Sequence, residues 1–82
     1  MIDEDCPIEG VREYFGNDHF ATEACGCLVD EASHGHAVCE FDVAEGHLNA
    51  KGNVMGGAIF TLCDFALAIA CNIGEHPTVS VE

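Results

Sequence analysis

The longest hydrophobic pattern in the chain is an apolar run from Val54 to Ile73, interrupted by few polar residues. It lacks the alternation of a strand, is long for one and is rich in Ala and Leu, so we expect a helix over residues 57–72. The sequence Asn72-Ile73-Gly74 is typical of a helix C-cap. Because apolar side chains occupy almost every face, this helix is predicted to be wrapped nearly all round.

Two shorter apolar segments upstream predict a β-hairpin. Residues 26–30 and 37–43 contain frequent apolar residues, and the second segment includes β-favouring Val and Phe. Ser33-His34-Gly35 between them is a loop signal. The Gly-rich stretch that follows, residues 45–53, is expected to be an irregular loop that leads into the long helix.

The N-terminal residues show less regular patterns. Residues 1–10 carry charges and turn formers without periodicity, and we expect them to be a disordered leader. Apolar residues at i, i+3 and i+4 predict a short helix over residues 11–15, before the turn signal Gly16-Asn17-Asp18. A second short helical turn is expected at residues 19–21.

The C-terminal residues 78–81 have the composition of a strand. One hairpin and one additional strand cannot cover a helix that is apolar on every side. We therefore expect residues 11–82 to be the N-terminal part of a single α+β domain. Its missing strands are expected beyond Glu82 or from another chain, and we favour the first alternative.

The charge balance limits the classes of partner. The chain has 15 acidic and 2 basic side chains in 82 residues, a formal charge of −13, so only Arg12 and Lys51 could contact a phosphate. Without the affinity that counterion release provides, we expect neither nucleic acid nor an anionic membrane as a partner. An acidic residue near the middle of the long helix, Asp64, also argues against a membrane span, since its transfer into lipid is costly.

The chain contains six cysteines, whose state depends on the compartment. Residues 1–5 lack the basic and apolar regions of a signal peptide, so we expect a reducing, cytoplasmic location and free thiols that pack as small hydrophobic side chains. A zinc site is the alternative. The pairs Cys25-x-Cys27 and His34-x-His36 could share a face of the hairpin and supply two thiolates and two imidazoles.

Candidate chemistry gathers on the long helix. Gly56 and Gly57 at its start leave backbone N–H groups unobstructed, which suits an oxyanion or a thioester carbonyl, although glycines also mark ordinary tight turns. Burial of the ionised Asp64 side chain in an apolar helix costs free energy unless it is paired or solvated. We interpret it as a general base or nucleophile, or alternatively as a carboxylate that caps a neighbouring loop or points to solvent. Eight residues of helix separate Gly56 from Asp64 by roughly 12 Å. One carbonyl cannot contact both, which predicts a symmetric dimer with two composite sites.

The run HLNAKGNVMGGAIFTLCDFALAIACN, residues 47–72, resembles the central motif of PaaI-type hotdog-fold acyl-CoA thioesterases, approximately N-x-x-G-x-x-H-G-G, six residues, then Asp. The segment DHFATEACGCLVDEASHGHAVCEF, residues 18–41, is similar to the opening hairpin of that family. The resemblance implies a hotdog fold, in which an antiparallel sheet wraps a long central helix. It also implies a homodimer or dimer of dimers that hydrolyses acyl-CoA between subunits without a metal or organic cofactor.

The resemblance also implies roles for individual residues. Asp64 matches the catalytic carboxylate, Gly56 matches the backbone amide that polarises the thioester carbonyl, and Asn49 matches the side chain that orients water or substrate. Met55 stands where the family often has His, and we assign it no acid or base role. This departure keeps open a non-catalytic module that binds acyl thioesters or only dimerises.

Further contacts with the substrate are expected from three residues. Gly57 completes the paired glycines, Ser80 matches a hydroxyl on the following strand, and Lys51 is one of the two cations that could meet the phosphates of CoA. The three histidines outside the H-x-H pair are expected at the surface or in loops, namely His19, His47 and His76.

Overall fold

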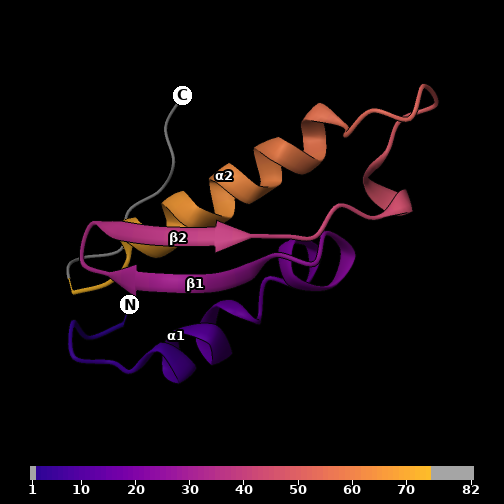
Figure 1. The fold of residues 1–82 in the computed structure, drawn as a ribbon. Helices are drawn as coiled ribbons and strands as arrows, with labels where there is room; N and C mark the ends of the chain where they lie inside the picture. Colours follow the sequence, from indigo (N-terminus) through magenta and orange to yellow (C-terminus); the bar gives the residue numbers. More distant parts are fainter. Residues whose placement is uncertain (1, 75–82) are drawn as a thin grey trace.

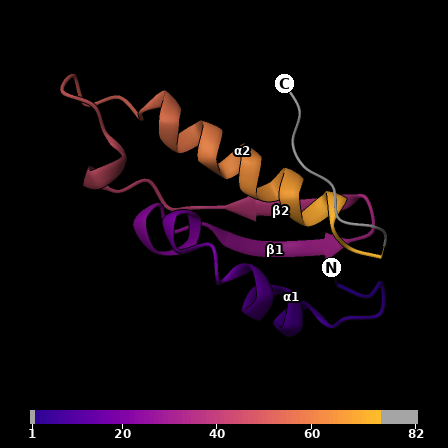
Figure 2. The same cartoon turned by 180° about the vertical axis from the view of Figure 1, so that it is seen from behind.

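The computed structural model describes residues 2–74 and shows an α+β chain. Its elements are the helices α1 and α2, a two-stranded sheet, a π-helical turn η1 and a 3-10 turn η2. In chain order these are α1 Ile8–Phe15, η1 Phe20–Ala24, β1 Leu28–Ser33, β2 His36–Glu40, η2 Glu45–His47 and α2 Gly56–Cys71. Two views show α2 alongside β2 and α1 alongside β1, so the helices flank the hairpin (Figures 1 and 2).

The predicted hairpin is confirmed. Strands β1 and β2 pair antiparallel, with Val29 opposite Cys39 and Ser33 opposite His36, and a register irregularity follows Val29. Gly35 has φ 73°, a left-handed conformation that favours glycine at the turn. The amide of Gly35 donates to the carbonyl of Ala70 at 3.0 Å, which ties this turn to the last turn of α2.

The long helix is also confirmed, within one residue of its expected bounds at each end. Asn72 is its C-cap, and the Asn72 side-chain amide donates to the carbonyl of Ala68 at 2.7 Å. The buried face of α2 consists of Ala58, Phe65 and Ile69, which point at the hairpin and η1. In residues 2–74, however, α2 is not wrapped all round. Large apolar side chains on its other side remain exposed, namely Ile59, Phe60 and Leu67.

The core forms where the hairpin, α1 and α2 meet. Val11, Phe65 and Ile69 are its most deeply buried large side chains, and the Phe15 ring meets the Phe65 ring edge-on at 6.4 Å between centroids. The Arg12 guanidinium Nε donates to the carbonyl of Val29 at 2.9 Å, beside the irregularity in β1. Helix α1 is therefore held to the sheet by both packing and a hydrogen bond.

The N-terminal residues differ from the expected disordered leader. Ile2 is buried, its amide donates to the carbonyl of Asn72 at 3.1 Å, and its carbonyl accepts from Gly74 at 2.6 Å. Ile2 and Ile73 thus form a parallel bridge across the two ends of the described chain. Helix α1 also starts at Ile8, inside the segment expected to be irregular. Local periodicity could not reveal this, because the pairing joins residues 71 positions apart.

Two other expectations concern shorter segments. The helical turn expected at residues 19–21 appears as η1, and the loop expected at residues 45–53 begins with η2. The strand expected at residues 78–81 lies outside the described residues. Between residues 2 and 74, no helix combines the length and the hydrophobicity that crossing a bilayer requires.

Candidate functional site

A pocket of about 490 Å³ lies at the start of α2 and is the setting for the candidate site. Its walls come from η1, from the segment around η2 and from the first two turns of α2. The lining residues are Phe20, Ala24, Cys25, Gly46, His47, Met55, Gly57, Ala58, Phe60 and Thr61. This lining is mainly apolar, with few polar groups, which is typical of pockets that hold an apolar group beside a polar anchor.

Of the paired glycines at the helix start, Gly57 lines the pocket and Gly56 directly precedes it. Met55 is the N-cap of α2, and its carbonyl accepts from the amide of Ala58 at 3.0 Å. A Cβ atom added at Gly56 or Gly57 would meet no atom within 4 Å, so nothing covers the backbone there. Within residues 2–74 their amide hydrogens have no acceptor. First-turn N–H groups carry the positive end of the helix dipole, so these two amides can bind an anion or a polarised carbonyl.

Asp64 is the only charged residue of α2, and the structure places its side chain in the exposed class. The apolar surroundings expected for this carboxylate are therefore not found in residues 2–74. Asp64 follows Gly57 by seven residues and lies on the same side of α2, two turns further along the axis. As expected from their spacing, one chain does not bring the Gly56 amide and the Asp64 carboxylate together.

Asn49 closes the loop that projects before α2. The side-chain Oδ1 of Asn49 accepts from the backbone amides of Lys51 at 2.9 Å and Asn53 at 3.1 Å. The backbone amide of Asn49 donates to the carbonyl of Asn53 at 2.8 Å. Leu48 and Val54 form an antiparallel bridge at the base of this loop. The Asn49 oxygen thus shapes the loop, as Asn side chains commonly do in turns.

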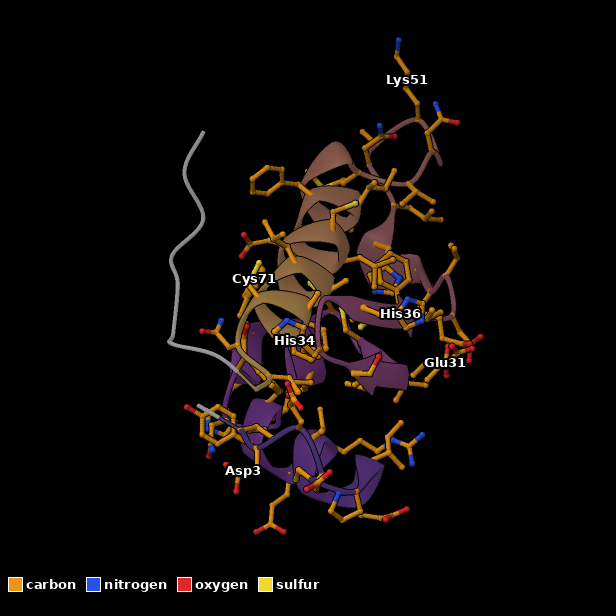
Figure 3. The ribbon with its side chains drawn as sticks, turned by 90° about the vertical axis from the view of Figure 1, so that its left-hand side faces the viewer. Asp3, Glu31, His34, His36, Lys51 and Cys71 are labelled. Atoms are coloured by element: carbon orange, nitrogen blue, oxygen red, sulfur yellow. The ribbon has the colours of Figure 1, made fainter. Side chains whose placement is uncertain are left out.

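Of the other predicted substrate contacts, Lys51 does not line the pocket. Lys51 lies at the tip of the projecting loop with its side chain directed outward, and it is not a lining residue (Figure 3). Ser80 lies outside the described residues. The predicted site residues that the structure does place around the start of α2 are therefore Gly56 and Gly57.

His47 was expected at the surface or in a loop; it lies in η2, within the segment expected to be a loop, but it is buried and not at the surface. The residue is only 8 % exposed and lines the pocket. Its Nε2–H donates to the carbonyl of Cys25 at 2.7 Å, its Nδ1 accepts from the amide of Ala44 at 2.9 Å, and its ring stacks on Phe41 at 4.3 Å between centroids. No local pattern in the sequence predicts this burial, because the contact with Cys25 spans 22 residues.

The proposed zinc ligands do not come together. Cys25 and Cys27 are buried before β1, whereas His34 and His36 lie at the turn at its other end, where His34 contacts the carbonyl of Ile73 and His36 contacts Glu31 (Figure 3). The seven residues from Cys27 to His34 span roughly 23 Å in extended chain. Within residues 2–74, no three residues of the His, Cys, Asp and Glu types are placed to hold a metal ion.

Two thiols around the hairpin, those of Cys27 and Cys39, are held in their neutral form. Burial, followed by the neighbouring Cys25 and Asp18, raises the pKa of Cys27. Burial, followed by Cys27 and Asp30, raises the pKa of Cys39 to about 11. Thiols with a raised pKa are poor nucleophiles, so these cysteines act as core residues, as expected.

Comparison with known proteins gives limited support for a function. No protein-family model matches the chain, and no solved structure matches it. The chain is 35 % identical over 75 residues to a curated protein of Archaeoglobus fulgidus named "Putative esterase". That alignment covers 92 % of this chain and 49 % of the relative, so the chain spans about half the length of the curated relative it matches. The likeness supports a hydrolase-type function.

Proposed function

We propose that the chain belongs to a hotdog-fold hydrolase that cleaves acyl-CoA thioesters at a site shared by two copies. The pocket at the start of α2, with the open Gly56 and Gly57 amides beside it, is the observation that carries the proposal. The likeness to an esterase-named protein supports hydrolysis, and the motif resemblance of residues 47–72 supports a thioester as the substrate.

In the proposed reaction, the acyl group occupies the apolar pocket and the thioester carbonyl accepts hydrogen bonds at the start of α2. The Gly56 amide then stabilises the negative charge that develops on the carbonyl oxygen, a contribution of about 10²–10³ in rate for one such donor. Asp64 of a second copy takes a proton from water, which attacks the carbonyl carbon. The tetrahedral intermediate collapses as the C–S bond breaks, and the CoA thiolate receives the proton.

The exposed position of Asp64 leaves its carboxylate accessible to a second copy. The carboxylate is two turns from the Gly56 amide, roughly 12 Å along the axis, and one carbonyl cannot contact both. It also lies between Phe60 and Leu67 on the uncovered face of α2, which are 64 % and 46 % exposed. A two-fold assembly that covers this face would bring each Asp64 toward the other chain's helix start.

The first experiment replaces the carboxylate. Asp64→Asn should lower the turnover of an acyl-CoA, followed by release of free CoA thiol, by about a hundredfold or more. Asp5→Asn, on the exposed N-terminal segment, is the matched control and should keep full turnover. Unchanged turnover in folded Asp64→Asn would exclude Asp64 as the base.

The second experiment tests whether two copies share one site. Gly56→Pro removes the amide N–H, and the helix tolerates Pro there because Gly56 is its first residue and Met55 already has φ −65° and ψ 139°. Each variant alone should be inactive. A mixture of Gly56→Pro and Asp64→Asn chains should regain about a quarter of wild-type turnover, because each mixed dimer holds one intact site. Mixed chains that exchange but stay inactive would contradict a shared site.

A module that binds thioesters without cleaving them is the second candidate. Met55 favours it, because this residue lines the pocket without an acid or base. Calorimetric binding of a non-hydrolysable thioether analogue of acyl-CoA, with no release of thiol from the thioester itself, would support this candidate over the enzyme.

A further inference from the structure

We infer that the His47 side chain is a positioning residue that fixes the amide groups at the start of α2. The inference deepens the proposed function, because it identifies what holds the carbonyl-binding amides in place. The placement of these amides can be measured without any substrate. The two proposals can therefore fail separately.

The His47 ring joins three separate parts of the chain. Its Nε2–H donates to the carbonyl of Cys25, directly after η1, and its Nδ1 accepts from the amide of Ala44, before η2. The ring face stacks on Phe41 with 25° between the planes, in the segment after β2. A buried side chain held by two hydrogen bonds and one stacked ring has little freedom to move.

The hydrogen-bond partners select one form of the ring. A carbonyl oxygen can only accept, so Nε2 must carry a hydrogen, and an amide can only donate to Nδ1, so Nδ1 must keep its lone pair. His47 is therefore the neutral Nε2–H tautomer. A second proton on Nδ1 would face the amide hydrogen of Ala44 and break that contact.

The backbone of His47 carries this anchoring to the helix. Its carbonyl accepts from the amide of Met55 at 2.7 Å, and Met55 is the N-cap directly before Gly56 and Gly57. The Leu48–Val54 bridge closes the intervening loop behind this contact. Because the ring fixes residue 47 against η1, it also fixes the position at which α2 begins.

The test compares substitutions that retain different parts of the anchor. His47→Phe keeps the ring that stacks on Phe41 but removes both hydrogen bonds. His47→Asn retains an acceptor near the Nδ1 position, and His47→Gln retains a donor near the Nε2 position. The matched control is His19→Phe, because His19 is exposed and its ring contacts the exposed Glu23 carboxylate.

The structural readout uses ¹⁵N NMR of the full-length protein. The imidazole ¹⁵N shifts of His47 should report a protonated Nε2 and an unprotonated Nδ1. The Gly56 and Gly57 amide resonances should shift in His47→Phe, shift less in His47→Asn and His47→Gln, and stay in place in His19→Phe. A protonated Nδ1 would overturn the inference, as would unmoved glycine resonances in folded His47→Phe. Should His47→Phe fail to fold, unmoved resonances in His47→Asn and His47→Gln would overturn it.

The kinetic readout separates positioning from simple stability. If the Gly56 and Gly57 amides are displaced in His47→Phe, kcat for an acyl-CoA should fall by about 10- to 100-fold while KM changes little. Displacement of these donors by a fraction of an ångström weakens their hydrogen bonds to the transition state most. Partial recovery of kcat is expected in His47→Asn or His47→Gln. An unchanged kcat in His47→Phe would contradict the positioning role of His47. A wild-type chain without turnover would contradict the proposed function alone, and the NMR result would then decide the role of His47.

Discussion

The face of α2 that packs on the hairpin and the face that points away from it carry similar residue types in different environments. Phe65 and Ile69 on the first are 2 % and 0 % exposed, whereas Phe60 and Leu67 on the second are 64 % and 46 % exposed. The second face also carries Asp64. Hydrophobicity therefore identifies the helix, but tertiary contacts decide which of its faces forms the core.

Truncating one Phe on each face of α2 tests the difference between the two faces directly. Phe65→Ala should lower the free energy of unfolding by about 3–5 kcal/mol, because it leaves a cavity in the core. Phe60→Ala should change it by only about 0.5 kcal/mol, as expected for an exposed position. Urea denaturation of the two variants measures both values.

The control for this pair is protein concentration. If a second copy covers the outer face of α2, the effect of Phe60→Ala should grow as the protein becomes more concentrated, while that of Phe65→Ala stays constant. Equal losses in both variants at low concentration would contradict the assignment of the two faces.

Thiol labelling compares the exposure of single sulfur atoms on the two sides of α2. Cys63 is exposed on the outer side of α2, whereas Cys39 is half-buried in the hairpin and burial raises its pKa to about 11. At pH 8 a thiol with that pKa has a thiolate fraction about a hundredfold below that of a thiol with the usual value. Iodoacetamide should therefore modify Cys63 faster than Cys39, as peptide mass spectrometry can show.

A dimer that covers the outer face changes this order in a defined way. Labelling of Cys63 should slow with rising protein concentration, and labelling of Cys39 should not. Fast modification of Cys39 in the folded protein would mean that the inner side of the hairpin is open.

The same thiol predicts a dependence of stability on alkaline pH. The pKa of Cys39 is raised from 9.0 to about 11, so between these values the folded state holds a proton that the unfolded state has lost. The contribution of this thiol to stability should thus be constant below pH 9 and fall as the pH rises toward 11. Cys39→Ala should reduce this fall and Cys63→Ala should not. Thermal unfolding at pH 8, 9.5 and 11 measures the difference.

The sequence predicted the elements whose signals are local. The Ala- and Leu-rich run identified α2, and the Ser33-His34-Gly35 signal located the turn between β1 and β2. The paired glycines likewise predicted an open helix start, since a missing side chain is itself a local property. These features required no knowledge of distant contacts.

The features that were missed depend on partners far along the chain. His47 is buried because the carbonyl of Cys25, 22 residues away, accepts a hydrogen bond from its Nε2, and Ile2 is buried because it pairs with Ile73. Neither arrangement has a periodic signature. The environment of Asp64 could not be deduced either, since an apolar helix sequence does not state which face its neighbours cover.

The smallest expected effect lies on the outer face of the hairpin, opposite the face that packs on α2. A hydrogen bond with the Asp30 side chain, followed by the negative charge of Asp30, raises the pKa of the exposed Glu40. Protonated Glu40 therefore stabilises the folded state. This contribution is present below the usual pKa of Glu and is lost as the pH rises through the raised pKa of Glu40. At pH 7 the two carboxylates therefore repel each other.

Glu40→Gln should relieve this repulsion, because the Gln amide can donate to Asp30 at any pH. Its urea midpoint should rise slightly at pH 7, and the gain should vanish at pH 4, where Glu40 itself can carry the shared proton. Glu13→Gln on α1 changes the net charge equally and serves as the control. An equal gain in both variants would assign the effect to the overall charge of −13 rather than to the Asp30 contact. Because exposed charge interactions are weak, a large gain would mean that this face of the hairpin is covered in solution.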